Sequence, residues 1–178
     1  MAKRSLPLSR VYRLLEPGPV ILLATAQAGR ADVMTQSWHT MMEFEPPLVG
    51  CVISDRNYSH ELLRASRECT INIPTAEIAR AVVGCGNASG RRLDKFRRYG
   101  LTPVPASRVG VPLIEECYAA LECKLADAKL ASRYCFFILE VIKAWIDPAV
   151  TAPRTLHHRG GGVFMLAGET IKLRSRAK

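Results

Sequence analysis

The sequence lacks any apolar run that approaches the roughly 18 residues with which a helix spans a bilayer. Its most apolar early stretch, residues 20–24, has neither the length of a signal peptide nor a cleavage site after it. Because neither a membrane segment nor a secretory signal is recognisable, we expect a cytoplasmic protein that does not associate with membranes.

The cysteines lack the spacing of a metal or redox motif. No two of the six have C-x-x-C spacing, which disfavours a zinc site or a thioredoxin-type motif. Six cysteines would suffice for a disulfide framework in a small secreted protein, but most of these lie within apolar runs. We therefore expect reduced, buried thiols. They are Cys51, Cys69, Cys85, Cys117, Cys123 and Cys135.

Motifs of the common hydrolases and nucleotide-binding folds are also missing. There is no Walker motif, no serine nucleophile elbow and no H-E-x-x-H, so nothing indicates hydrolysis. Residues 84–90 contain three glycines, but the third stands one residue too late for a dinucleotide loop and the segment before them is helix-like. We expect a helix end and a turn there instead.

Two adjacent histidines near the C-terminus do not form a metal site by themselves. His157 and His158 would point to opposite sides of a strand, and no carboxylate or cysteine stands nearby at ligand spacing. We expect no bound metal. The three glycines at residues 160–162 suggest instead that the backbone approaches a ligand or a partner subunit closely.

Acidic side chains are in the minority. The chain has 25 Lys and Arg against 16 Asp and Glu, a formal net charge of +9. Such an excess suits nucleic-acid binding or an enzyme that holds phosphorylated ligands. The basic residues are dispersed apart from 91–92, 97–98 and the tail 172–178, and no helix-turn-helix or zinc-finger spacing is present. We expect no nucleic-acid partner, and a basic nucleic-acid-binding barrel stays as the weaker alternative.

What the chain does contain is a series of short apolar runs. Its 178 residues are 48% hydrophobic, enough for one domain with a sizeable core. Antiparallel hairpins with short helices between them predict a mainly β barrel with helical decorations. We expect a polar arm up to residue 10, and strands at 20–26, from 31 onward, 48–53, 69–73, 118–128, 134–146 and within 156–173. We expect helices at 11–15, 59–65, after Thr75, and at 91–99.

The segment between the third strand and its helix has the composition of an anion cradle. Backbone N–H groups at a helix start, the hydroxyls of Ser54 and Ser59, and the guanidinium of Arg56 all favour negative charge. Simple capping by Ser59 beside a solvated Arg56 is the alternative.

Two further segments carry polar groups in unusual places. Thr35, Gln36, Ser37 and Trp38 form an oddly polar stretch for a sheet, and hydroxyl and amide groups beside a flat apolar wall suit a flavin ring. The alternative is a core tryptophan among ordinary strand residues.

In the predicted 91–99 helix, Arg92 and Lys95 share a face, so they reach one anion or form a surface face with Asp94 as counter-charge.

The order of these motifs resembles the flavin reductase-like, FMN-binding split-barrel family, over about residues 8–170. Within that family the chain is most similar to the flavoredoxin-type branch. The resemblance implies a split β-barrel, antiparallel and Greek-key-like with short helices, as one domain over 1–178 with a core at about 8–170 and the basic tail at 172–178. The motifs that carry it are Thr35-Gln36-Ser37-Trp38, Glu45-Pro46-Pro47, Ser54 to Ser59, Asp94-Lys95-Phe96 and Glu140-Val141.

The resemblance also implies a homodimer with FMN near the subunit interface. Thr35, Gln36, Ser37 and Trp38 would line the ring and ribityl chain, and Lys95 would close over the flavin or phosphate. Ser54, Arg56, Asn57 and Ser59 would hold the phosphate, and Arg92 completes the set of predicted cofactor-binding residues. No residue is predicted to be catalytic, since the flavin carries the chemistry.

The activity that the resemblance implies is electron transfer from NAD(P)H through FMN to a flavin, a metal complex or a protein acceptor, with a monooxygenase as one such partner. Members that use NAD(P)H often carry a small-Asp-His element before the late long strand. Here the matching residues are 132–135, S-R-Y-C, with no histidine. Arg133 would still attract a nucleotide phosphate. An FMN-containing electron carrier without its own NAD(P)H site therefore remains an alternative.

Overall fold

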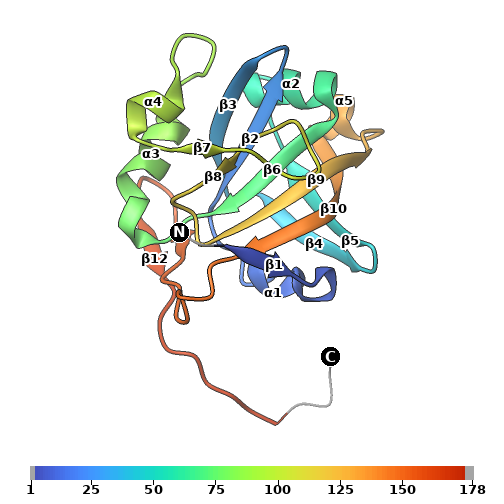
Figure 1. Cartoon of the computed structure of the whole chain (residues 1–178). Coiled ribbons are helices and arrows are strands. Elements are labelled where there is room, and N and C mark those ends of the chain that lie inside the picture. Colours follow the sequence, from blue (N-terminus) through green and yellow to red (C-terminus); the bar gives the residue numbers. More distant parts are fainter. Residues whose placement is uncertain (1–2, 175–178) are drawn as a thin grey trace.

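Eight strands form the main sheet of the computed structural model, which describes residues 3–174 (Figure 1). The strand order is β3-β2-β6-β9-β10-β5-β4, β1 also pairs with β10, and all of these pairs are antiparallel. The sheet curls into a barrel that stays split between β3 and β4. The strands are β1 (Arg4–Leu6), β2 (Ile21–Gln27), β3 (Arg30–Gln36), β4 (His39–Phe44), β5 (Pro47–Val52), β6 (Glu68–Ile73), β9 (Ala119–Asp127) and β10 (Phe136–Ile146).

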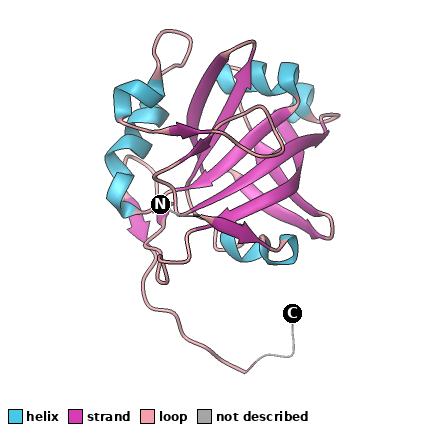
Figure 2. Cartoon of the chain, in the orientation of Figure 1, coloured by secondary structure: helices cyan, strands magenta, loops and turns pink. Residues whose placement is uncertain are grey.

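Short helices and two small hairpins surround the barrel (Figure 2). The α-helices are α1 (Tyr12–Leu15), α2 (Tyr58–Ser66), α3 (Ala79–Asn87), α4 (Lys95–Tyr99) and α5 (Ala131–Tyr134). Two 3₁₀ turns, η1 (Leu8–Arg10) and η2 (Ala76–Ile78), precede α1 and α3. The small hairpins are β7 (Pro103–Val104) with β8 (Leu113–Ile114), and β11 (Leu156–His158) with β12 (Phe164–Leu166). Among residues 3–174, no helix has the length and apolar character that crossing a bilayer requires.

Strand β2 is buried on both faces, which explains its nearly unbroken apolar sequence. Ile21 and Leu23 point into the barrel interior, while Leu22 and Ala24 point outward into a second cluster. That second cluster lies between the sheet and the helices α3 and α4, and Val82 and Phe96 belong to it. The mainly β fold with short helices, predicted from the sequence, is confirmed.

Two strands differ from the sequence prediction. The expected polar arm contains β1, whose Arg4 lies opposite Ile146 of β10, because backbone pairing needs no apolar side chains. The strand expected from residue 31 onward is in fact two strands. It breaks at Ser37 and Trp38, and the chain then returns as β4, antiparallel to β5.

The helix starts also differ. Asn57, not Ser59, is the N-cap residue of α2, so the capping role considered for Ser59 is wrong. The helix predicted at 91–99 begins only at Lys95, because Asp94 is its N-cap and accepts a hydrogen bond from the Arg97 N–H at 3.1 Å. Thr75 precedes η2, and its hydroxyl donates to the Glu77 carboxylate instead of capping the helix.

The glycines at residues 84–90 are divided between a helix and the turn after it. α3 continues through Asn87, so Gly84 and Gly86 are helical, and only Gly90 lies in the following turn. Gly84 packs against the ring of Tyr99 on α4, where an added Cβ would collide with a ring carbon. The helix therefore ends later than the sequence predicted. The close packing of α3 against α4 explains why a glycine stands at position 84.

Candidate functional site

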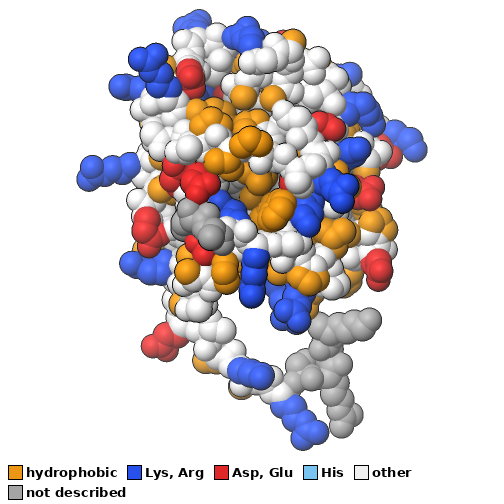
Figure 3. Space-filling view, in the orientation of Figure 1, with side chains coloured by type: hydrophobic (Ala, Val, Ile, Leu, Met, Phe, Trp, Pro, Cys, Tyr) orange, Lys and Arg blue, Asp and Glu red, His pale blue; other side chains and the backbone are white. Residues whose placement is uncertain are grey.

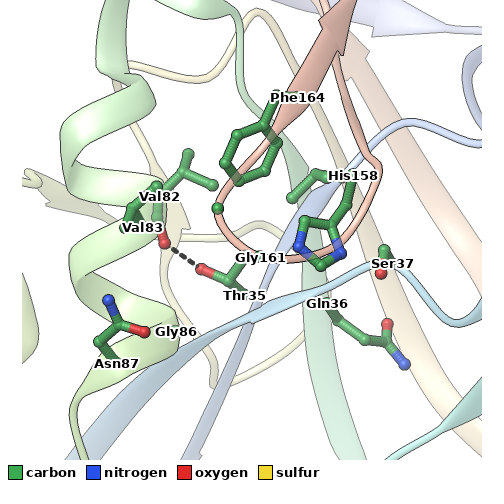
Figure 4. Close-up of a pocket in the computed structure, with 12 residues that line it drawn as sticks. Thr35, Gln36, Ser37, Val82, Val83, Gly86, Asn87, His158, Gly161 and Phe164 are labelled. Atoms are coloured by element: carbon green, nitrogen blue, oxygen red, sulfur yellow. Dashed lines mark hydrogen bonds between the residues drawn. The ribbon is translucent and has the colours of Figure 1, made fainter.

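A cavity of about 490 Å³ opens where the end of β3 meets α3 and the β11–β12 hairpin (Figure 4). Its volume lies within the range of about 300–1,000 Å³ that is usual for small-molecule sites. Strand, helix and hairpin come from three distant parts of the sequence. The lining residues are Val20, Thr35, Gln36, Ser37, Val82, Val83, Gly86, Asn87, His158, Gly161, Gly162 and Phe164.

A short hydrogen bond holds the end of β3 against α3. The Thr35 hydroxyl donates to the Val82 carbonyl at 2.5 Å (Figure 4). Gly86, one turn further along α3, faces the same side chain, and an added Cβ would be in ordinary van der Waals contact with the Thr35 Cβ at 3.4 Å. The cavity therefore has one wall made by a strand end and a helix face that are fixed to each other.

Gln36 borders the cavity, and its side-chain amide links β3 to β5 across the split. Its side-chain amide donates to the carbonyls of Trp38 and Val52, each at 3.1 Å. The Val52 N–H in turn donates to the Trp38 carbonyl at 3.0 Å. Trp38 itself is 71% exposed and is not among the cavity-lining residues, so the flat wall expected there is not formed by Trp38 within this chain.

The β11–β12 hairpin supplies the opposite wall. Gly160, Gly161 and Gly162 all have positive φ (92°, 58° and 78°), a conformation that favours glycine and that turns the chain tightly. His158 and Phe164 are cross-strand partners, and their ring centroids lie 5.3 Å apart. Gly161 and Gly162 border the cavity, and the close approach of this backbone to a ligand or a partner subunit stays a prediction.

The side chains of His158, Phe164 and the α3 face were not anticipated from the sequence. Val82, Val83, Gly86 and Asn87 follow helical spacing, a signal that was visible but did not show what faced them. The pairing of His158 with Phe164 depends on a hairpin that three glycines close. No short sequence motif predicts that hairpin.

The predicted anion cradle lies between β5 and α2. The Asn57 N–H donates to the Ser54 carbonyl at 3.0 Å, and the Arg56 N–H donates to the Ser54 hydroxyl at 3.3 Å. The Arg56 side chain is exposed and has no carboxylate partner among residues 3–174. Since β5 ends at Val52, the Gln36 hydrogen bond joins the start of the cradle to the cavity strand.

Three predicted site residues lie apart from the cavity wall. Ser59 is fully buried and donates to the Asp32 carboxylate at 2.8 Å. Lys95 is 4% exposed, and its ammonium lies 3.0 Å from Asp32 Oδ1 and donates to the Val33 carbonyl at 2.6 Å. Arg92 is exposed in the turn before α4, so the expectation that Arg92 and Lys95 share a helix face is wrong.

Burial shifts the pKa of two titratable side chains near the site, Cys85 and His39, toward the neutral form. Burial raises the pKa of the Cys85 thiol to about 11, so this side chain of α3 is protonated rather than a reactive thiolate. His39, which follows Trp38, has its pKa lowered by burial, against a hydrogen bond of 2.7 Å between its Nε2 and the Pro19 carbonyl. In the described part of the chain, no group of three or more His, Cys, Asp or Glu is placed to hold a metal ion.

Positive charge does not gather into one stripe on the face shown in Figure 3. Lysine and arginine side chains are scattered over this face and along its edges, with hydrophobic and other uncharged side chains between them. This arrangement differs from the continuous basic track with which proteins follow a nucleic-acid backbone.

A split antiparallel barrel with a small-molecule cavity at the end of one edge strand defines the class of protein. The family model for the flavin reductase like domain matches residues 12–164. The chain therefore belongs to the flavin reductase-like family, as its motifs predicted.

Known proteins agree with this assignment. The uncharacterized protein YddH of Escherichia coli (strain K12) is 33% identical over an alignment 178 positions long, gaps included. The alignment covers 92% of this chain and 94% of that protein. The solved FMN-binding domain of a flavin reductase-like enzyme from Shewanella baltica OS155 is 28% identical, with a TM-score of 0.92 over 97% of this chain and 98% of that one. Flavoredoxin of Desulfovibrio vulgaris (Miyazaki F) shares the fold, with 24% identity and a TM-score of 0.82 over 90% and 92% of the two chains.

Proposed function

We propose that this chain is an FMN-binding oxidoreductase that passes electrons from NAD(P)H through FMN to a flavin, a metal complex or a protein acceptor. The observation that carries the proposal is the cavity between β3, α3 and the β11–β12 hairpin, in a fold that matches a solved FMN-binding domain along nearly its whole length. When bound, FMN supplies the hydride and electron transfer chemistry. The chain has to bind it, orient it and admit a donor.

The residues of the cavity suit a flavin ring. Val82, Val83 and Phe164 offer apolar walls for its faces. The side chains of Ser37, Asn87 and His158 make no hydrogen bond to any other residue within 3–174, so their polar atoms are free for the polar edge of a ligand. An apolar slot with a few unpaired polar groups is the combination that a flavin requires.

We propose that the ribityl phosphate extends from this cavity to the cradle of Ser54, Arg56 and Asn57. An exposed guanidinium without a carboxylate partner is available for charge-assisted hydrogen bonds to phosphate. Arg92 is proposed as a second cation near the phosphate. Ser59 and Lys95 are both buried against Asp32. We propose that they lie beneath the cradle, on the side that faces the protein interior. The net charge of +9 favours FMN and NAD(P)H alike.

The ring end of the site would favour negative charge on the bound cofactor. Residues 35–37 border the cavity, and their backbone N–H groups and the Ser37 hydroxyl are the donors proposed to stabilise an anionic ring edge without any proton transfer by the protein, since the Thr35 hydroxyl already donates to the Val82 carbonyl. For this reason no side chain of the chain is proposed as a catalytic acid or base.

We further propose a homodimer with the cavity near its interface. Trp38, Met42 and Phe44 are large apolar side chains left 71%, 45% and 54% exposed on and beside β4, next to the cavity strand. Exposed apolar side chains that gather in this way mark protein interfaces. Sedimentation equilibrium checks this: a dimer supports the proposal, and a monomer at micromolar concentration contradicts it.

A second candidate function is an FMN-containing electron carrier without its own NAD(P)H site. The residues at 132–135, which have no histidine, lie at α5 and just after it, and Tyr134 is 55% exposed. This segment therefore offers Arg133 as its one cation for a nucleotide. The absence of a histidine there is what favours the carrier.

One set of measurements separates these functions. The purified protein is titrated with FMN while flavin fluorescence is followed, and the complex is then mixed anaerobically with NADH or NADPH. Loss of the visible flavin absorbance supports the oxidoreductase, and bound FMN that stays oxidised supports the carrier. A protein that binds no FMN contradicts both and leaves the nucleic-acid-binding barrel, which salt-dependent binding to oligonucleotides would reveal.

A further inference from the structure

A buried carboxylate, Asp32, joins three elements of the fold behind the cradle. Asp32 lies on β3 and is 2% exposed. Its Oδ2 accepts a hydrogen bond from the Ser59 hydroxyl of α2 at 2.8 Å, and its Oδ1 lies 3.0 Å from the ammonium of Lys95 on α4. The carboxylate therefore contacts the first turns of two helices at once.

These contacts are directional, which packing alone does not require. Burying an ion pair costs several kcal/mol of desolvation, so a well-packed apolar side chain would serve stability as well or better. What the ion pair provides is a fixed geometry. Ser59 is the second residue of α2 and Lys95 is the first residue of α4, so Asp32 sets where both helices begin relative to β3.

A glycine and a surface ion pair complete the same arrangement. At Gly90 an added Cβ would collide with Asp32 Oδ1, so the backbone before α4 passes directly against the carboxylate. Arg91, the next residue, forms an ion pair of 2.8 Å with Glu61 of α2. The turn before α4 and the start of α2 are thus held together on both sides of Asp32.

We infer that Asp32 is a positioning residue for the phosphate end of the site, and this inference rests on the proposed FMN function. Asp32 holds Ser59, and Ser59 holds the first turn of α2, whose N-cap is Asn57 of the cradle. The ring end is held separately, by the hydrogen bond of Thr35 to Val82 on α3. Loss of Asp32 is therefore expected to disturb recognition of the phosphate more than recognition of the ring.

The experiment compares FMN with riboflavin, which has the same ring but no phosphate. In Asp32→Asn, the dissociation constant for FMN is expected to rise about tenfold or more, the effect of misplacing one charge-assisted hydrogen bond between the cradle and the phosphate. The dissociation constant for riboflavin is expected to change less than about twofold. Asp127→Asn is the matched control, because it makes the same substitution on another strand, where the carboxylate forms a solvent-exposed ion pair of 3.6 Å with Lys129, and both affinities should stay unchanged.

Two more variants keep the test decisive if Asp32→Asn folds poorly. The double variant Asp32→Asn with Lys95→Met leaves no isolated buried charge, and Ser59→Ala leaves the ion pair intact while removing its link to α2. Circular dichroism and urea unfolding establish that each variant is folded. Both are expected to lower the ratio of FMN affinity to riboflavin affinity, with the smaller effect in Ser59→Ala.

Equal weakening of FMN and riboflavin in the folded variants would overturn the inference, because it would indicate a general structural role. An unchanged affinity ratio would overturn it as well. Failure of the unmodified protein to bind FMN is a different result, which overturns the proposed function and the inference with it.

Discussion

The two faces of strand β2 belong to two different parts of the molecule. Its inward residues, Ile21 and Leu23, lie in a cluster inside the barrel that contains Phe137 and other fully buried side chains. Its outward residues lie in a second cluster, under α3 and α4, which includes Val20 and Val82 of the cavity wall. One strand thus contributes alternate residues to a filled interior and to a layer that opens into a cavity.

The difference indicates a division of roles. The inner cluster is a packed barrel core, whose main effect is on stability. The outer layer holds the cavity, the buried ion pair of Asp32 and Lys95, and the helix starts that border the cradle. Substitutions in the first region should change the free energy of unfolding, and those in the second should change ligand affinity. The four predictions below test this division.

The largest expected effect is in the inner core. Phe137→Ala removes a fully buried ring and leaves a cavity, so the free energy of unfolding should fall by about 3–5 kcal/mol. Urea denaturation measures this loss. The folded protein should keep its affinity for FMN, and a large change in that affinity without loss of stability would contradict the division of roles.

Glu122 is a polar group that supports the barrel from its outer face. Its buried carboxylate accepts hydrogen bonds from the Trp145 ring N–H at 2.7 Å, from the Ser107 N–H and hydroxyl at 3.0 Å each, and from the Arg108 N–H at 2.5 Å. Burial alone would raise the pKa of Glu122, but these hydrogen bonds outweigh it and hold the pKa below its ordinary value.

Glu122→Gln should therefore lower the free energy of unfolding by about 2 kcal/mol at neutral pH. Because the folded state lowers the pKa, the stabilisation is complete above the pKa of the unfolded chain and is lost as the pH falls through the folded value. Urea unfolding across the acid range should show a steeper loss in the parent than in Glu122→Gln. Parallel curves would contradict the pKa argument.

Arg56→Ala tests the cradle. Loss of a charge-assisted hydrogen bond to phosphate, worth about 1.5–3 kcal/mol, should weaken FMN binding by about 10- to 150-fold. Stability should change little, because Arg56 is exposed. Arg64→Ala, an exposed arginine at the other end of α2, is the control and should bind FMN normally. Equal affinities in the two variants would rule out Arg56 as a phosphate ligand.

The smallest expected effect concerns the hairpin wall. Phe164→Ala should weaken FMN binding by about 2- to 10-fold, since the contribution of one aromatic contact is about 0.5–1.5 kcal/mol. Met165→Ala removes the neighbouring side chain, which does not line the cavity, and serves as control. Fluorescence titration measures both. Indistinguishable affinities would place the ligand away from this hairpin.

Strand alternation and turn residues made most of the barrel predictable from the sequence. The long strands β9 and β10 were expected nearly as they are, because their apolar residues recur along a pattern that suits a sheet. β1 was missed because only backbone pairing with β10 defines it. The break at Ser37 and Trp38 was missed because no Gly, Pro, Asn or Asp marks it.

The site was predictable only where its residues are adjacent in sequence. Thr35 to Ser37 stood out because polar side chains are unusual in a strand, and residues 35–37 do border the cavity. Asp32 and Lys95 are brought together by tertiary packing. No local sequence pattern could therefore reveal that the Lys95 ammonium forms an ion pair with Asp32. His158 was seen only as a poor metal ligand, because its facing partner depends on how a glycine turn closes.

The most direct measurement is a crystal structure of the protein grown with FMN. The account predicts an isoalloxazine ring between α3 and the β11–β12 hairpin, with the phosphate against residues 54–57. Electron density for the flavin elsewhere on the barrel, or a cavity that stays closed by its own side chains at saturating FMN, would contradict it.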